Sequence, residues 1–298
     1  MSCAAFTASM AGQRPKIEDA VTRPVLRWHG GKWMLAPWIV AHFPRHRVYV
    51  EPFGGAASVL MRKNRSYAEV LNDLDASLVN LFRVLRDPMR VHCLRRRLEL
   101  TPFARDEWLL AYEPSTDPVE EAARLVVRCF MGFGNDGARR DVCTGFRGSV
   151  SRRGSIPARD WVGYPAALDA AAARLQGVII EHRDAVACMA YYDAPDVLHY
   201  VDPPYHPETR TRAVGSRGYT HDMSAEDHAR LLAELGTLSG MVILSGYPHA
   251  SYEASLRGWR RVERPALADG ARHRTEVLWI NAAASEALSR TARDLFTA

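Results

Sequence analysis

The residues best suited to chemistry are four consecutive ones, Asp202, Pro203, Pro204 and Tyr205, which follow an apolar run at 197–201. Neither proline has a backbone N–H and each ring fixes φ, so the turn is stiff and offers mainly carbonyl oxygens. The Asp202 carboxylate adds further acceptors, and the Tyr205 ring supplies a flat face. Such an edge suits a planar substrate with an amino group, whose hydrogens the acceptors bind while the ring stacks. The alternative is a Pro-Pro turn that merely ends a strand.

Three stretches upstream carry residue types that can bind a small ligand. Residues 27–32 (Arg-Trp-His-Gly-Gly-Lys) combine two glycines, which let a ligand approach the backbone, with Trp28 for an aromatic or cationic group and Lys32 for a carboxylate. Residues 51–55 (Glu-Pro-Phe-Gly-Gly) end one predicted strand, and Asp73 lies at the end of the next. The spacing of roughly 20 residues from the glycines to Asp73 matches the acidic residue that binds ribose hydroxyls in nucleoside-binding α/β folds. Each stretch alone is also compatible with an ordinary turn, but together they indicate a nucleoside pocket beside an amine-binding edge.

Hydrophobic patterning predicts that these stretches lie at the ends of strands in an α/β sheet. Strands are predicted at 48–53, 67–71, 178–181, 197–201, 241–245 and 274–280, and helices at 56–61, 76–86, 164–175 and 225–235. Residues 88–132 are helical by pattern, with helix starts at Thr101-Pro102 and Asp117-Pro118. Because ligands bind at the carboxyl ends of the strands in open α/β sheets, we expect the motifs to meet at one edge.

Changes in patterning and composition along the sequence predict how the chain divides into domains. A helical and basic stretch interrupts the α/β pattern, and residues 132–154 within it are rich in Gly, Arg and Ser without periodicity. We expect a flexible N-terminal tail at 1–22, a catalytic domain at 23–87 and 177–285, an insert at 88–176, and a C-terminal tail at 286–298.

The composition, with 47% hydrophobic and 24% charged residues, is that of an ordinary globular chain. No apolar run approaches the ~20 residues of a membrane helix, and residues 1–22 lack the apolar region of a signal peptide. The five cysteines are scattered without a CxxC pair, which indicates reduced thiols and argues against a disulfide framework or a zinc site. We therefore expect a cytoplasmic protein that does not contact a membrane.

The positive charge of the chain is nearly all arginine, since lysine occurs only at positions 16, 32 and 63. Two groups of arginines stand out: Arg139, Arg140, Arg147, Arg152 and Arg153 in the glycine-rich stretch, and Arg210, Arg212 and Arg217 after the Pro-Pro motif. The first group is opposed nearby only by Asp136 and Asp141. Such clusters are typical of surfaces that bind nucleic-acid phosphates, although a solvated loop would also carry them.

The motifs and their order resemble those of the Dam-type, D12 class N6-adenine DNA methyltransferases of phages and bacteria. The resemblance covers about 24–281. The similar segments are 27–32, the glycine loop 50–55, the acidic motif 72–75, the catalytic motif 200–205, and the closing strands with 245–247 and 275–281. The position of the basic insert, between the acidic and catalytic motifs, is similar to that in the α group of amino-methyltransferases.

This resemblance implies a Rossmann-like methyltransferase sheet, with 88–176 as an inserted, mainly helical target-recognition domain. It implies S-adenosylmethionine as methyl donor and no metal. The donor would be bound by Trp28, Gly30, Lys32, Glu51, Phe53, Gly54 and Asp73, and the catalytic residues would be Asp202, Pro203, Pro204 and Tyr205. His29 departs from relatives that often carry a small residue there, so we expect it either to narrow the donor pocket or to change the contacts within it.

The expected partner is double-stranded DNA, contacted by Arg139, Arg140, Arg147, Arg152, Arg153, Arg210 and Arg212, and the expected state is a monomer in a bacterial or phage-infected cell. An N4-cytosine methyltransferase is the nearest alternative, because its target amine has the same geometry. Methylation of RNA or of protein glutamine fits the basic insert and the motif order less well. A non-catalytic DNA-binding relative is disfavoured by the retained Asp202, Asp73 and Lys32.

Overall fold

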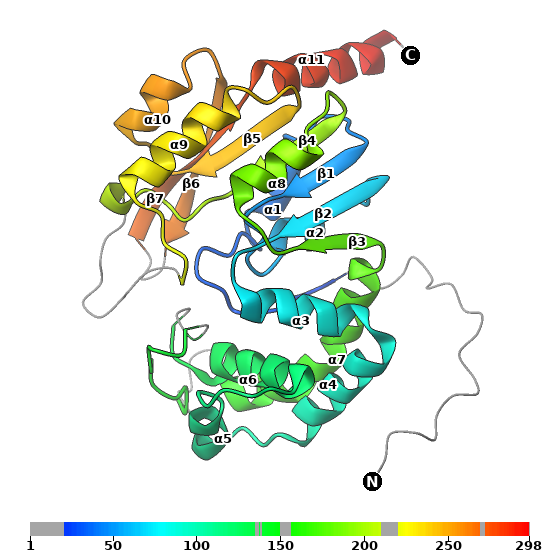
Figure 1. Ribbon diagram of the computed structural model, residues 1–298, viewed down its shortest axis with the longest axis vertical. Coiled ribbons are helices and arrows are strands. Elements are labelled where there is room, and N and C mark those ends of the chain that lie inside the picture. Colours follow the sequence, from blue (N-terminus) through cyan, green and yellow to red (C-terminus); the bar gives the residue numbers. More distant parts are fainter. Residues whose placement is uncertain are drawn as a thin grey trace, which may run out of the picture.

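A seven-stranded sheet forms the centre of the molecule, in the order β3-β2-β1-β4-β5-β7-β6 (Figure 1). The computed structural model describes residues 21–134, 137, 139–149, 156–209, 220–268 and 272–297. The strands are β1 (Val48–Glu51), β2 (Ala68–Asn72), β3 (Val178–Glu181), β4 (Val197–Val201), β5 (Met241–Gly246), β6 (Arg260–Ala268) and β7 (Arg272–Ile280). Strand β7 runs antiparallel to both of its neighbours, and the other neighbouring pairs are parallel. The predicted Rossmann-like α/β sheet is confirmed.

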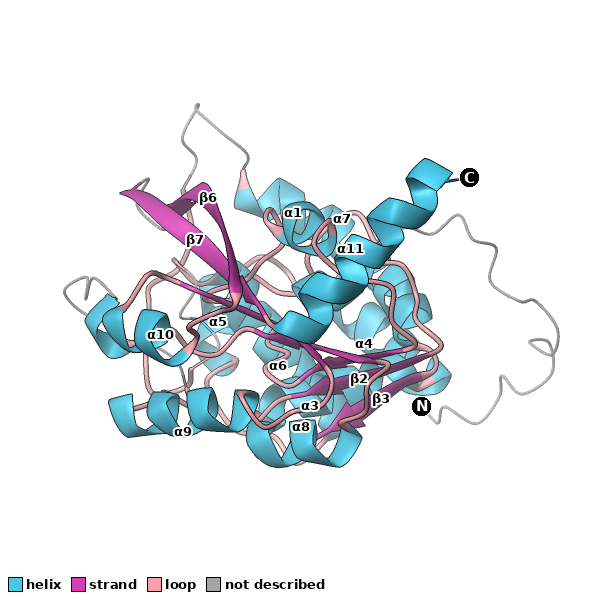
Figure 2. Ribbon diagram, turned by 90° about the horizontal axis from the view of Figure 1, so that it is seen from above, coloured by secondary structure: helices cyan, strands magenta, loops and turns pink. Residues whose placement is uncertain are grey.

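Helices cover both faces of the sheet, which explains why its central strands are buried throughout. Every residue of β4 and β5 is buried, as expected for parallel strands between two helical layers. Tyr200 and Ile243 pack on the side of α1 (Ala36–Val40) and α2 (Ser58–Arg62). Val201 and Leu244 pack on the other side with α9 (Ala225–Leu235) and α10 (Ala250–Ser255). Figure 2 shows α1 and α11 (Ala282–Thr297) on one face, and α8 (Ala185–Tyr192) and α9 on the other.

A helical layer adjoins the sheet below β3 in Figure 1. It contains α3 (Ala76–Arg86), α4 (Pro88–Leu100), α5 (Arg105–Leu110), α6 (Pro118–Met131) and α7 (Pro157–Leu175). Asp75, Asp87 and Asp117 cap α3, α4 and α6, because each side chain accepts a backbone N–H of the first turn. One hydrophobic cluster extends from the sheet into these helices, so the insert shares its core with the catalytic part. The domain boundaries at 87/88 and 176/177 stay a prediction.

Buried charges fix this helical layer to the sheet. The Glu69 carboxylate on β2 accepts two hydrogen bonds from Arg174 on α7, at 2.6 and 2.9 Å, and one from Lys63 at 2.6 Å. Glu69 is 3% exposed. A carboxylate buried to that degree is stable as an ion only with such partners. The network therefore positions the end of the insert against the strand that leads to Asp73.

The structure differs from the sequence prediction at several elements. Strand β6 was not predicted because its polar residues, such as Arg260 and Glu263, give no apolar alternation; it is an edge strand paired only with β7. Helix α5 begins at Arg105 instead of Pro102, and α7 begins at Pro157 instead of Tyr164. The C-terminal tail predicted at 286–298 stays a prediction; helix α11 extends through it to Thr297, and its residues Ala287 and Leu288 pack against the core.

None of the helices in the described part of the chain combines the length and the apolarity that a bilayer crossing requires.

Candidate active site

A cavity of about 210 Å³ lies where β1, β2, β3 and β4 end. Its wall includes four of the predicted donor-binding residues, namely Trp28, Gly30, Phe53 and Asp73. Three of the predicted catalytic residues, Asp202, Pro203 and Pro204, form another part of the same wall. His29 also lines the cavity. The structure therefore brings the four sequence motifs together around one space, as expected for the carboxyl edge of an open sheet.

The glycine loop after β1 can lie close to the cavity because it lacks side chains. A Cβ at Gly54 would lie 2.6 Å from Leu71 Cδ1, so this loop packs directly on β2. Gly55 has φ +48°, a left-handed conformation that glycine adopts without strain. A Cβ there would lie 3.1 Å from Nε1 of Trp28, so the indole covers the loop. Both glycines serve packing, and Gly55 also exposes backbone to the cavity.

Asp73 is oriented by backbone groups on both sides of its carboxylate. Oδ2 accepts the N–H of Gly55 at 2.8 Å, and Oδ1 accepts the N–H of Asp75 at 2.8 Å. Burial raises the pKa of Asp73 above its usual value, and these two N–H donors act in the opposite direction. The preceding residue, Asn72, is fully buried and donates to the carbonyl of Pro52 at 2.9 Å. A carboxylate held in this way can accept further hydrogen bonds from hydroxyl groups of a ligand in the cavity.

Both oxygens of Asp202 have partners on neighbouring elements. Oδ2 forms an ion pair with Lys32 at 2.9 Å, and Oδ1 accepts the hydroxyl of Ser245, at the end of β5, at 2.7 Å. Lys32 is 5% exposed and also donates to the carbonyl of Gly30 at 2.9 Å. Lys32 thus lies against the Asp202 carboxylate and is not part of the cavity wall. The two contacts leave acceptor capacity on Asp202, because a carboxylate offers about four lone-pair sites.

Tyr205 is buried behind Asp202 and does not line the cavity. Its hydroxyl donates to the carboxylate of Glu276 at 2.7 Å, and its ring lies edge-on to Tyr247 at 4.4 Å. The ammonium of Lys32 lies 4.6 Å from the centre of the ring. Burial raises the pKa of Tyr205 far above its usual value, and the charge of Glu276 acts in the same direction. Stacking of Tyr205 on a substrate ring stays a prediction, and it would require this side chain to turn toward the cavity.

Glu51 supports the site from within the core. It is 3% exposed, and its Oε2 accepts the hydroxyl of Tyr49 at 2.8 Å and the N–H of Leu60 at 3.1 Å. Burial raises the pKa of Glu51 to about 8, and the bond from Tyr49 acts against this rise. Like Gly54 and Lys32, Glu51 lies outside the cavity wall. Direct contact of any of these three residues with the methyl donor stays a prediction.

Sequence reasoning did not assign three residues that the structure places at the site. Ser245 holds Asp202, and Glu276 holds Tyr205. Asp184 lines the cavity after β3 and caps α8. Two of these had a signal: Asp184 follows a predicted strand, and Glu276 is a carboxylate within a strand that is otherwise apolar after position 276. Ser245 belongs to the segment 245–247 that resembles the closing strands of the family, but that resemblance assigned it no role.

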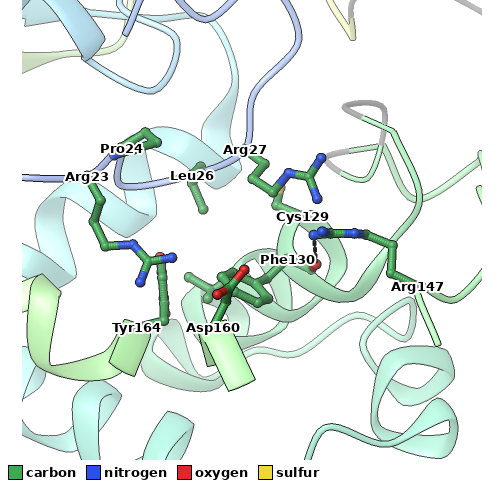
Figure 3. Close-up of a pocket in the computed structure, with 10 residues that line it drawn as sticks. Arg23, Pro24, Leu26, Arg27, Cys129, Phe130, Arg147, Asp160 and Tyr164 are labelled. Atoms are coloured by element: carbon green, nitrogen blue, oxygen red, sulfur yellow. Dashed lines mark hydrogen bonds between the residues drawn. The ribbon is translucent and has the colours of Figure 1, made fainter. Parts of the chain in front are cut away.

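A second cavity, of about 150 Å³, lies between residues 23–27 and helices α6 and α7. Figure 3 shows the side chains of Arg23, Arg27 and Arg147 around it, with Asp160 at its edge. The guanidinium of Arg23 covers the ring of Tyr164, with its Cζ 5.1 Å from the ring centre. Arg147 donates to the carbonyl of Phe130 at 3.1 Å. The predicted DNA contact Arg147 is thus one of three arginines that converge on one hollow.

The other arginines predicted to contact DNA have different surroundings. Arg139 forms two hydrogen bonds to Asp141, at 2.9 and 2.6 Å, and Arg140 forms an ion pair with Glu121 on α6. Besides the acidic residues of the glycine-rich stretch itself, the fold thus places Glu121 against this group of arginines. Arg152, Arg153, Arg210, Arg212 and Arg217 lie outside the described residues. All DNA contacts stay predictions.

The sheet order, the antiparallel β7 and the cavity at the carboxyl edge define a Rossmann-like methyltransferase fold. Residues 28–134 match the family model of the D12 class N6 adenine-specific DNA methyltransferases. This segment contains the glycine loop and Asp73 and extends through α6. The family resemblance that the motifs indicate is therefore confirmed.

Curated relatives match a shorter part of the chain. DNA adenine methylase of Serratia marcescens is 38% identical over 65 residues, which are 22% of this chain and 23% of that protein. The protein of the same name from Haemophilus influenzae is 35% identical over 74 residues, 24% of each chain. That of Escherichia coli K12 is 36% identical over 64 residues, 22% of this chain and 23% of that protein. The alignments thus span about a quarter of these relatives.

Proposed function

We propose that this protein is a site-specific DNA methyltransferase that transfers a methyl group from S-adenosylmethionine to the N6 amine of an adenine extruded from duplex DNA. The observation that carries this proposal is the single cavity whose wall contains both Asp73 and Asp202. One carboxylate suits the ribose of a nucleoside-type donor, and the other suits the amine of the acceptor. The family match and the DNA adenine methylase relatives support adenine as the target.

The cavity fits the donor by its charge and its apolar surfaces. Asp73, Asp184 and Asp202 contribute carboxylates, while Trp28 and Phe53 contribute aromatic surface. S-adenosylmethionine contains a positively charged sulfonium group attached to an adenosine, and when bound it supplies the methyl group of that sulfonium as an electrophile. Carboxylates and aromatic faces both bind such cations favourably. We propose that Asp73 binds the ribose hydroxyls and that Trp28 and Phe53 pack against the donor.

The residues at the catalytic edge would hold the amine without forming a covalent bond to it. An adenine within the duplex is not accessible to the cavity, so the base must be flipped out. The carboxylate of Asp202 and the carbonyl of Pro203 would accept the two amine hydrogens, which directs the nitrogen lone pair toward the methyl group. Lys32 and Ser245 keep Asp202 in place during this step.

The arginine-lined cavity supports DNA as the partner. Arg23, Arg27 and Arg147 gather positive charge from two segments that are far apart in the sequence. Phosphate binding by such groups supplies most of the non-specific affinity of a protein for DNA. We propose that Arg147 contacts the DNA backbone there, in a protein that acts as a monomer in the cytoplasm.

Replacing Asp202 with Asn tests this proposal. The amide keeps the size of the side chain but weakens amine binding, so methyl transfer should fall by about 10²-fold or more while donor binding persists. Donor binding is measured by calorimetry, and products are identified by mass spectrometry of digested DNA. Methyl transfer by Asp202→Asn at the rate of the unmodified protein would contradict the proposal. Formation of N4-methylcytosine would favour the cytosine alternative instead.

A further inference from the structure

Three side chains with metal-binding atoms converge beside the catalytic motif. They are His206, which directly follows Tyr205, Glu208 on the 3-10 helix η2 (Pro207–Thr209), and His249, which precedes α10. One ligand atom from each residue lies within 4.8 Å of those of the other two. The Nε2 atom of His249 lies 3.0 Å from Oε2 of Glu208, and the rings of His206 and His249 stack at 3.8 Å.

We propose that His206, Glu208 and His249 bind a divalent transition-metal ion such as Zn²⁺. Two imidazoles and one carboxylate are a donor set that zinc accepts, whereas Mg²⁺ and Ca²⁺ prefer oxygen ligands alone. Ligand atoms at about 2.1 Å from a tetrahedral ion lie about 3.4 Å from one another. The separation of 3.0 Å between His249 and Glu208 is close to this value, the other two pairs lie within 4.8 Å, and Glu208, whose side chain is 76% exposed, has room to adjust.

The surroundings of His249 resemble those of a metal-binding imidazole. Its Nδ1 atom lies 2.8 Å from the hydroxyl of Ser251, so the ring is held by the nitrogen that does not face Glu208. With an ion on Nε2, Nδ1 would carry the proton and donate it to the Ser251 hydroxyl, and the cap in which Nδ1 accepts the Ser251 N–H at 3.3 Å would be given up. His206 is 6% exposed, and its Nδ1 accepts the N–H of Glu208 at 3.4 Å. Binding of one ion by both imidazoles would tilt the stacked rings relative to each other, because lone pairs in two nearly parallel ring planes do not converge on one point.

The position of the site indicates what the ion would do. The loop after β4 contacts the end of β5 and the loop after β5 at three successive points: Asp202 to Ser245, Tyr205 to Tyr247, and His206 to His249. A bound ion would add coordination bonds at the third of these points. The metal would thus fix the far end of the catalytic motif to the loop that follows Ser245, the partner of Asp202. Its role would be structural, in addition to the proposed methyl transfer.

Binding of Zn²⁺ to the metal-free full-length chain tests this inference without any methyl-transfer assay. The variants are Glu208→Gln and His249→Asn; Asn retains an acceptor that can cap α10. The matched control is His92→Asn, which changes an exposed histidine on α4. We expect the unmodified chain and the control to bind one equivalent of Zn²⁺, with affinity at least about tenfold higher than in either variant.

Two further readouts separate loss of the site from loss of the fold. Zn²⁺ should raise the midpoint of thermal unfolding of the unmodified chain and of His92→Asn, but not that of the two site variants. Co²⁺ should give the visible absorption of a tetrahedral complex only in the first two proteins. Equal Zn²⁺ affinity in all four proteins, or no stoichiometric binding by the unmodified chain, would overturn the proposal. The cluster would then be only an ion pair with a helix cap.

Discussion

The active-site cavity and the arginine-lined cavity differ in how their charged groups are held. Asp73 and Asp202 are fixed by short hydrogen bonds to the backbone, to Ser245 and to Lys32. The guanidinium of Arg23 instead lies over an aromatic ring, and Arg147 bonds to one carbonyl. A small ligand that must react is bound by preorganised groups, whereas a polyanion is attracted by charge density with little fixed geometry. Changes in the two cavities should therefore have separable effects.

Of the binding affinities, the one for the methyl donor should change most, through substitution of Asp73 in the active-site cavity. Asp73→Asn removes the charge and one of the acceptors that the Gly55 and Asp75 N–H groups require. Since hydrogen bonds to charged groups contribute about 1.5–3 kcal/mol, donor affinity should fall by about tenfold or more. Calorimetry with S-adenosylmethionine measures this change, and DNA affinity serves as the second readout. Asp169→Asn, on the exposed surface of α7, is the control. If Asp73→Asn also lowered the affinity for DNA, the two cavities would not act separately in binding the methyl donor and the DNA.

In the arginine-lined cavity we expect a smaller effect, which changes the affinity for DNA and not the affinity for the methyl donor. Arg147→Gln should weaken DNA binding to a similar degree for all DNA sequences. It should also reduce the slope of log K for DNA binding against log salt concentration by about one. Arg139→Gln is the matched comparison, because Asp141 already neutralises that arginine. Its effect on DNA affinity should be the smaller of the two. Fluorescence anisotropy over a salt series measures both. An equal loss in the two variants would show that pairing with Asp141 does not limit the contribution of Arg139.

A third effect concerns the stability of the fold and depends on Glu51 in the core. Its pKa is raised from 4.5 to about 8 in the folded protein. Between these values the folded chain holds a proton that the unfolded chain releases, so stability falls as pH rises through this window. This contribution is at most about 1.4 kcal/mol per pH unit, and Glu51→Gln should remove it. Urea unfolding at several pH values measures the slope. Identical slopes for the two proteins would contradict the assignment.

The fold was largely predictable because its elements carry local signals. Helices α3 and α9 match their predicted bounds, since each has an apolar face and a capping side chain, Asp75 or Ser224. Strands β4 and β5 are continuous apolar runs of the expected length. Strand β6 and the start of α7 were missed, because edge position and packing, not local pattern, determine them.

The candidate site was predictable only in part. The ends of β1, β2 and β4 had to meet at one edge, so Phe53, Asp73 and Asp202 could be assigned together from their order. The partners of these residues could not be assigned. Ser245 and Glu276 come from strands far along the chain, and nothing near them in sequence indicates which side chain they contact.

The sequence by itself determined the class of fold, the order of the motifs and the residue types at the carboxyl edge, because these depend on local patterning and on the rules of parallel sheets. Only the tertiary structure decided which charges are paired. It placed Lys32 on Asp202, Glu121 on Arg140, and Glu208 beside two histidines. The physical reason is that ion pairs and metal-binding clusters depend on distances of a few ångströms between segments that the sequence separates by up to 170 residues.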